Sequence, residues 1–162
     1  MKTKSFIQIA TLAALLAGAS APAFAVEENN TAPGLSAAGA PVGLHGADPV
    51  ALLTTNKEVL GTAKFTVVQD KVAYYFASQK NADTFKANPK KYVVQNGGFC
   101  TFGVSVAKKF DGDPRYAAVV DGKVYVFLNE EIYKMFLKDK AGTIAKAAAN
   151  WPKIMSTAAT AL

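Results

Sequence analysis

The sequence contains very few of the side chains on which most catalytic and metal sites depend. It has one cysteine, one histidine and one tryptophan, which are Cys100, His45 and Trp151. With a single cysteine no intramolecular disulfide can form, so the hydrophobic core must stabilise the fold alone. One thiol and one imidazole could act as a nucleophile–base pair only if the fold brought them together. No phosphate-binding glycine loop, dinucleotide-binding fingerprint or H-E-x-x-H zinc motif is present, and we therefore expect a protein that is not an enzyme.

Long apolar runs are also missing, apart from a short one near the N-terminus. Lys2 and Lys4 precede an apolar stretch at residues 6–17, and small residues then lead to Ala23-Phe24-Ala25. A basic start, a short apolar core and an A-x-A exit are typical of a secretory signal peptide. A membrane anchor would need about 18 continuous apolar residues. We predict a signal peptide at residues 1–25 that is cleaved after Ala25, a mature chain without a transmembrane span, and a location in the periplasm.

Basic residues are not concentrated in any part of the sequence. Loss of Lys2 and Lys4 with the signal peptide lowers the net charge from +6 to +4. The remaining lysines form no basic block interleaved with aromatic residues, so a nucleic-acid partner is not expected. A weakly basic surface could instead meet an anionic membrane surface or an acidic partner such as an envelope protein.

The mature chain is predicted to form one small α+β domain. Residues 26–42 carry few large apolar groups and are expected to be a flexible linker. A folded domain is expected at 43–155, with a C-terminal tail at 156–162. This length is sufficient for one hydrophobic core.

Two β-hairpins are predicted, each followed by a helix. Strand-like runs occur at 65–68 and 72–76 and again at 116–120 and 123–128, with turn sequences between them. The last of these runs is apolar on both faces, so we expect it to be buried in the centre of the sheet. Helices are expected from the caps Ser78 and Asn129 to about residues 87 and 139, and a third at 143–148. The order hairpin-then-helix occurs twice, but the sequence shows no internal repeat. The expected fold is an antiparallel sheet from two β-hairpins with helices packed on it.

Several segments resemble the YHS domain, whose usual pattern runs D-P-V-C, then Y-F-C-S-x-x-C-x-x-x-F, then P-x-x-Y. The matching residues here are Asp48-Pro49-Val50, Tyr75-Phe76-Ala77-Ser78, Phe85, Asn88-Pro89 and Tyr92. The chain is more closely similar to the exported YHS-domain proteins of proteobacteria over roughly residues 43–154. This closer similarity rests on the segments at 97–103, 108–114, 120–125 and 150–152.

The resemblance implies a domain suspected of binding metal through its cysteines. The corresponding positions here are Ala51, Ala77 and Asn81, none of which can supply a thiolate. The exported group opens with G-Y-D-P-V-A-Y-F, and the last two aromatic rings of this segment are replaced here by the aliphatic side chains Leu52 and Leu53. If those rings line a site, this chain has altered it.

Three residues remain as candidate metal ligands, namely Cys100, His45 and Asp48. Cys100 follows Gly97-Gly98, a glycine pair that permits close backbone approach. If the three side chains meet, the set would suit copper or zinc better than magnesium or calcium. Each also has a structural alternative: Cys100 as a small buried apolar residue, His45 as a solvated side chain, and Asp48 as a turn opener before proline.

Neighbouring charged residues complete the set of candidates. Lys108 and Lys109 could favour the thiolate of Cys100 if their loop folds back on it. Asp111 and Asp113 lie in a loop that is too short for a helix-loop-helix calcium site, so we expect a solvated turn.

Two functions from different classes follow from these observations. The first is a periplasmic YHS-like binding module that holds or senses a small ligand, with a soft metal ion near Cys100 as the favoured one. The alternative is a structural or protein-interaction module in which Cys100 is a core residue and no ligand is bound.

Overall fold

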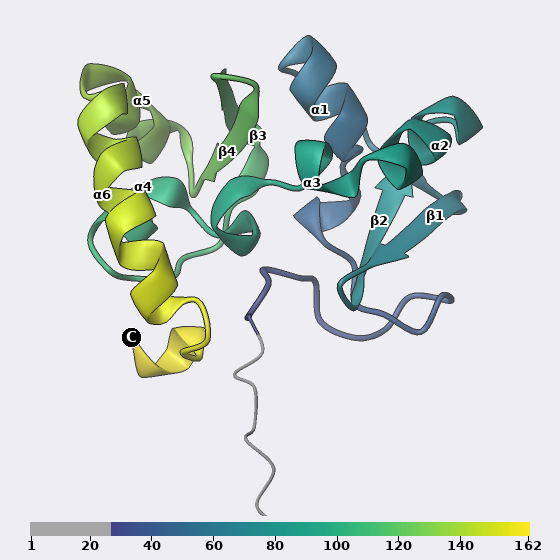
Figure 1. Ribbon diagram of the computed structural model, residues 1–162, viewed down its shortest axis with the longest axis horizontal. Coiled ribbons are helices and arrows are strands. Elements are labelled where there is room, and N and C mark those ends of the chain that lie inside the picture. The colour runs from purple at the N-terminus through teal and green to yellow at the C-terminus, as the bar shows by residue number, and fades with distance from the viewer. Residues whose placement is uncertain (1–26) are drawn as a thin grey trace, which may run out of the picture.

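The computed structural model describes residues 27–162, so the predicted signal peptide lies outside the described residues. The α+β fold class is confirmed: two small antiparallel sheets alternate with helices, and the elements form two halves that lie side by side (Figure 1). The first half, residues 44–94, contains α1 (Pro49–Thr55), β1 (Thr62–Gln69), β2 (Val72–Phe76), α2 (Gln79–Ala87) and α3 (Pro89–Tyr92). The second half, residues 95–154, contains α4 (Thr101–Ser105), β3 (Asp113–Val120), β4 (Lys123–Phe127), α5 (Glu130–Lys138) and α6 (Lys140–Ile154).

The two predicted hairpins are present, and each forms its own two-stranded antiparallel sheet. Both have two-residue turns with positive φ at the two central positions, Asp70-Lys71 and Asp121-Gly122. This conformation matches the twist of the flanking strands, which is why Asp-Gly is a strong hairpin signal. Lysine adopts positive φ less readily than glycine, and the turn at Asp70-Lys71 is correspondingly the weaker signal in the sequence.

The two halves repeat one arrangement of elements at a constant spacing of 51 residues. In the first hairpin Thr62 pairs with Phe76, and in the second Asp113 pairs with Phe127; both hairpins then shift register at the same place. The helices that follow also correspond, since Ser78 caps α2 and Asn129 caps α5. The expectation of no internal repeat was therefore wrong at the level of structure.

The repeat escapes detection in the sequence because few of the equivalent positions carry the same residue. The buried aromatic residues do recur, and they occupy matching positions in the two halves. These pairs are Tyr74 and Tyr125, Phe76 and Phe127, and Phe85 and Phe136.

The two hairpins do not join into one sheet, so β4 is not the central strand of a sheet that we expected; it lies instead between the two main parts of the core. Val124 and Val126 belong to a cluster formed mostly by the first half, with Phe76 and Phe85 among its members. The alternate residues Tyr125 and Phe127 belong to a second cluster, which also contains Phe136. Successive strand residues face opposite sides, so this one strand supplies apolar surface to both halves.

Helix boundaries agree with the capping residues. The side chains of Ser78 and Asn129 accept hydrogen bonds from the backbone N–H groups three residues on, at 3.2 Å and 2.9 Å. The last helix begins earlier and ends later than the predicted 143–148. Asp139 both ends α5 and caps α6 by accepting from the Gly142 N–H at 2.9 Å, so the second helix begins directly after the first.

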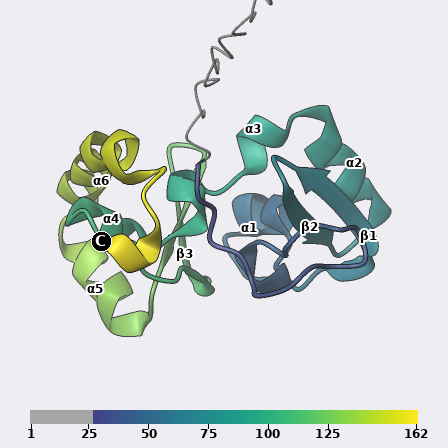
Figure 2. The same cartoon turned by 90° about the horizontal axis from the view of Figure 1, so that it is seen from below.

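Residues 27–42, which we expected to be a flexible linker, lie along the folded domain; we call this segment the N-terminal strap. Figure 2 shows it running from the middle of the molecule across the first half. The Glu28 N–H donates to the Met155 carbonyl at 2.8 Å, and the Asn30 N–H donates to the Gly97 carbonyl at 2.8 Å. Backbone hydrogen bonds and an ion pair between Glu28 and the buried Lys109 thus hold this segment in place, although it has few apolar side chains.

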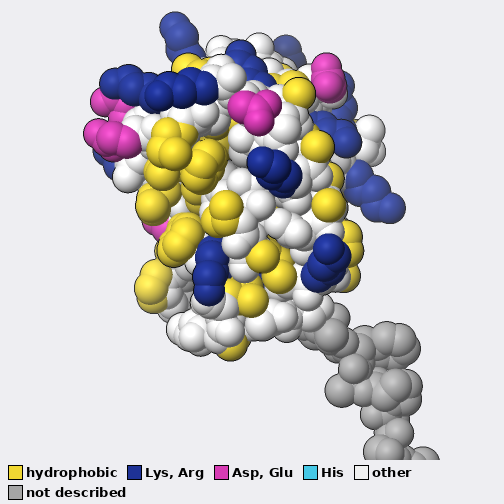
Figure 3. Space-filling view, turned by 90° about the vertical axis from the view of Figure 1, so that its left-hand side faces the viewer, with side chains coloured by type: hydrophobic (Ala, Val, Ile, Leu, Met, Phe, Trp, Pro, Cys, Tyr) yellow, Lys and Arg dark blue, Asp and Glu magenta, His cyan; other side chains and the backbone are white. Residues whose placement is uncertain are grey.

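Charged side chains are dispersed over the surface in the view of Figure 3, where lysine and arginine side chains are separated by uncharged and apolar ones. Within residues 27–162, no helix has both the length and the hydropathy needed to span a bilayer.

Candidate functional site

Cys100 is a core residue of the second half. It is only 1% exposed, and it packs in the cluster that contains Tyr125, Phe127 and Phe136. Burial raises the pKa of its thiol above the ordinary value, which disfavours the thiolate that binds metal or attacks disulfides. The surroundings therefore match the structural alternative for this residue.

The glycines before Cys100 make room for other parts of the chain. A Cβ atom on Gly97, which has a φ of +59°, would lie 2.8 Å from the Glu28 carbonyl oxygen and 3.1 Å from the Trp151 ring. A Cβ atom on Gly98, with a φ of +80°, would face Asn30. The glycine pair thus lets the N-terminal strap and Trp151 approach, rather than opening a path to the thiol.

Lys109 is likewise occupied elsewhere than at Cys100. Its Nζ donates to Glu28 Oε2 at 2.8 Å and to the carbonyls of Met155 and Thr157 at 2.9 Å and 2.7 Å. The same atom lies 5.3 Å from the centre of the Trp151 ring. The lysine joins the strap to the C-terminal segment, and its hydrogen bonds leave it no role in activating the thiol.

Asp48 is fully buried and serves as a structural acceptor. Its Oδ1 accepts from the N–H groups of Val50 and Ala51 at 2.8 Å and 3.0 Å, which caps α1. Its Oδ2 accepts from the Ala77 N–H at 2.9 Å and from the Asn81 amide at 2.7 Å. Both carboxylate oxygens are thus engaged, and Asn81, which stands where the YHS pattern has a cysteine, completes this network.

His45 pairs with Asp111, a residue that we had expected only in a solvated turn. The His45 Nε2 and Asp111 Oδ1 atoms are 2.9 Å apart, and the same oxygen accepts from the Asn30 side chain at 2.7 Å. The carboxylate therefore links the first half, the second half and the strap. These residues stand at one end of a shallow groove of about 690 Å³ that also includes Leu60 and Tyr75.

The three candidate ligands thus occupy three different environments: an apolar cluster, a buried helix cap and an exposed ion pair. Among residues 27–162, no three His, Cys, Asp or Glu side chains are grouped so that they could hold a metal ion.

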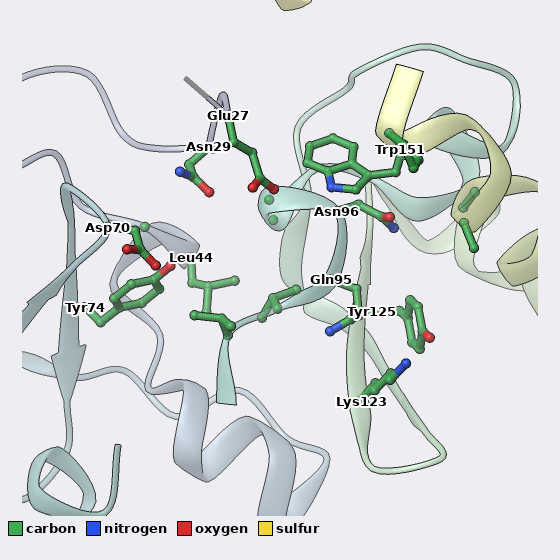
Figure 4. Close-up of a pocket in the computed structure, with 18 of the residues that line it drawn as sticks. Glu27, Asn29, Leu44, Asp70, Tyr74, Gln95, Asn96, Lys123, Tyr125 and Trp151 are labelled. Carbon is green, nitrogen blue, oxygen red and sulfur yellow. The ribbon is translucent and has the colours of Figure 1, made fainter. Parts of the chain in front are cut away.

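A larger cleft, of about 770 Å³, lies between the two halves (Figure 4). Leu44 and Tyr74 line it from the first half, and Tyr125 and Trp151 line it from the second. The segment 93–98, which joins the halves, contributes further lining residues, as does the start of the strap. Tyr74 and Tyr125 are equivalent residues of the two hairpins, so the cleft is formed where the two copies of the repeat face each other.

Charged groups are distributed unevenly around the cleft. Asp70 lies beside Tyr74, Glu27 lies between Asp70 and Trp151, and Lys123 lies beside Tyr125 across the opening (Figure 4). Burial, together with the negative charges of Asp70 and Glu27, raises the pKa of Tyr74 to about 12. The hydroxyl of Tyr74 is therefore protonated at neutral pH, and Asp70 is the carboxylate beside it (Figure 4).

The tyrosine hydroxyls have no protein partner in the described part of the chain. Tyr74 and Tyr125 are each 8% exposed, and neither hydroxyl forms a hydrogen bond to residues 27–162. In the same part of the chain, no fully buried side-chain oxygen or nitrogen lacks a partner. The two hydroxyls therefore reach solvent, and these side chains line the cleft. Buried polar groups are normally satisfied by protein or water, so these are positions at which a ligand can bond.

Sequence reasoning did not predict this cleft, because the residues that line it come from segments that are far apart in the sequence. One signal could have found it: both hairpins carry D-x-x-x-Y-x-F, from Asp70 to Phe76 and from Asp121 to Phe127. The motif places an aromatic residue with a polar tip at the same point of each half. What the motif does not reveal is that the two tyrosines line one cleft.

Comparisons with family models, curated proteins and solved structures found no match to this chain. The resemblance to the YHS domain, which rests on sequence motifs, stays a prediction.

Proposed function

We propose that this protein is a non-enzymatic binding module of the periplasm and that it holds a small organic molecule in the cleft between its two halves. The observation that carries the proposal is the lining of the cleft. Tyr74, Tyr125 and Trp151 supply aromatic surface, and both tyrosine hydroxyls lack a protein partner among residues 27–162. Ligand sites are typically concave, about 300–1,000 Å³ in volume, and apolar with a few polar groups; the cleft has these properties.

Binding fits the cleft better than catalysis does. Cys100 and His45 are the residues best suited to act as nucleophile and base, and neither is among the residues that line the cleft. The polar groups that do line it are amides, carboxylates, lysines and phenols. Such groups orient a ligand by hydrogen bonding and charge.

The cleft also has more support than a metal ion at Cys100. A soft metal needs an accessible thiolate and further ligands, whereas this thiol packs among aromatic rings with a raised pKa. The periplasmic location rests on the predicted signal peptide, and the relation to exported YHS-domain proteins rests on the motifs quoted above.

A screen of small molecules against the mature protein tests the proposal. Trp151 lines the cleft and is the only tryptophan, so its fluorescence reports occupancy directly, with thermal shift as a second readout. Ala148 is exposed and lines the cleft from α6, and Ala148→Phe should fill the space and abolish binding of the hits. Ala145 is exposed on the same helix outside the cleft, and Ala145→Phe is the matched control.

Hits that bind the Ala148→Phe variant unchanged would contradict the assignment of the cleft. Elemental analysis of protein purified without added metal or chelator tests the competing function, which is metal binding. Copper or zinc that co-purifies with the native chain and is absent from Cys100→Ser would replace the proposed function with metal binding.

A further inference from the structure

We infer that the ligand of the cleft is an organic cation: a primary ammonium group, carried on an apolar body, that binds beside Tyr74 between Asp70 and Glu27. This inference rests on the proposed function and names its ligand class.

The first support is the placement of charge. Asp70 and Glu27 come from the first hairpin turn and from the strap, and both line the cleft; Asp70 lies beside Tyr74, and Glu27 lies between Asp70 and Trp151 (Figure 4). Neither carboxylate forms an ion pair with residues 27–162. Burial is the main cause of the raised pKa of Tyr74, and the charges of the two carboxylates add to it. A cation between the two carboxylates would therefore meet negative potential.

The second support is the Tyr74 hydroxyl itself. Its side chain is more than nine-tenths buried and lines the cleft, and its oxygen has no hydrogen-bond partner within the described chain. An ammonium group has three N–H donors and no acceptor. The Asp70 carboxylate and the phenol oxygen supply two acceptors at this point, and Glu27 adds a second negative charge farther along the cleft.

The rest of the cleft fits an apolar body. Leu44 and Trp151 line it beyond the acidic side, and aromatic faces also attract cations. Two lysines line the cleft as well. Lys71 follows Asp70 in the turn, and Lys123 lies on the opposite wall (Figure 4). An anionic ligand would bind at one of these lysines rather than at Asp70 and Tyr74, so the charge preference of the cleft distinguishes the two kinds of ligand.

Three probes that share a phenyl body and a short chain test the inference: 2-phenylethylamine, 2-phenylethanol and 3-phenylpropionate. Each is titrated against the mature protein by calorimetry and by Trp151 fluorescence. We expect the amine to bind about tenfold or more tightly than the alcohol, because hydrogen bonds to charged groups are the stronger ones. The carboxylate should bind most weakly.

Asp70→Asn should weaken binding of the amine about tenfold and leave binding of the alcohol unchanged. Asp70 has a φ of +49°, which asparagine also tolerates, so the turn should persist. The matched control is Asp121→Asn, at the equivalent turn of the second half and outside the cleft, which should bind all three probes as the native chain does. Glu27→Gln is the second variant and should act like Asp70→Asn.

Equal affinity for the amine and the alcohol, tightest binding of the carboxylate, or no binding of any probe would overturn the inference. The proposed function is tested separately, by whether the Ala148→Phe variant fails to bind the hits of the general screen.

Discussion

The ammonium of Lys109 lies at the point where the strap and the C-terminal segment meet. Its side chain is completely buried, it bonds to Glu28 and to two backbone carbonyls, and it faces the rings of Phe99 and Trp151. Burying a charge is costly unless it is paired and hydrogen-bonded, and here every donor of the ammonium has an oxygen acceptor.

Replacing this lysine should therefore destabilise the protein. Lys109→Met keeps the apolar stem but removes the donor to Glu28 and to the carbonyls of Met155 and Thr157. We expect a loss of about 1–3 kcal/mol, the usual cost of leaving a buried polar group without its partner. Urea unfolding measures it. Lys108→Met, at the exposed neighbour, should cost less than about 1 kcal/mol; similar losses for the two variants would contradict the role of Lys109.

Cys100 gives a prediction about pH. Burial raises its pKa above the ordinary value of 9.0, so the folded chain keeps the thiol proton longer than the unfolded chain does. The stability due to this difference is complete below the pKa of the unfolded chain and is lost as pH rises through the folded pKa.

The free energies of unfolding of the native chain and Cys100→Ala should thus converge as pH rises above about 9. Urea unfolding at a series of pH values tests this, and other titrating groups cancel in the comparison. A difference that is independent of pH would show that the thiol is not protected in the fold.

Helices α2 and α5 present equivalent phenylalanines to the core. Phe85 and Phe136 are both fully buried, and each packs against the aromatic residues of its own hairpin. Phe85→Ala and Phe136→Ala should each cost about 3–5 kcal/mol, cavity included. Phe110 is largely exposed, and Phe110→Ala should cost about 1 kcal/mol or less. If one of the two core variants loses no more free energy of unfolding than the Phe110 variant does, the two halves do not share one packing scheme.

At the scale of elements, the sequence predicted what local chemistry determines. Ser78, Asn129 and the Asp121-Gly122 turn act on residues within a few positions, so they identify helices and hairpins before any tertiary contact is known. The strap and the start of α6 were missed. The strap is held by Glu28 against Lys109, which is 81 residues away, and such a partner is not visible in a local pattern.

For the candidate site too, local contacts could be predicted from the sequence and contacts between distant residues could not. Asp48 before proline was correctly given a turn-opening alternative, because its partners at Val50 and Ala51 are local. The pairing of His45 with Asp111 and the meeting of the two halves at Tyr74 and Tyr125 depend on contacts between distant residues. Residue spacing within one segment contains no information about them.

At the scale of the whole molecule, β4 makes the two halves depend on each other. Val124 and Val126 complete the cluster of the first half while Tyr125 and Phe127 complete that of the second. Without Val124 and Val126, apolar residues of the first half that belong to this cluster would be exposed to solvent. We therefore expect one cooperative unfolding transition for residues 27–162.

Trp151 fluorescence reports on the second half, and far-ultraviolet circular dichroism reports on the helices of both. The two signals should give the same urea midpoint. A fragment of residues 43–94 should remain unfolded in isolation. Two separated midpoints, or a folded fragment, would show that the halves are independent domains.

Lys109 joins the N-terminal strap to the C-terminal segment, and this brings the two ends of the described chain together. The Glu28 N–H bonds to the Met155 carbonyl at 2.8 Å, and Glu28 Oε2 accepts from the Ala159 N–H at 3.0 Å, so the strap and the C-terminal segment lie in contact. The described chain is thus nearly a closed ring. Adjacent ends and an exposed turn elsewhere are what circular permutation requires, and the Asp121-Gly122 turn is exposed. Joining residue 162 to residue 27 and opening the chain at that turn would place β4, α5 and α6 ahead of all other elements while keeping every contact of the cleft.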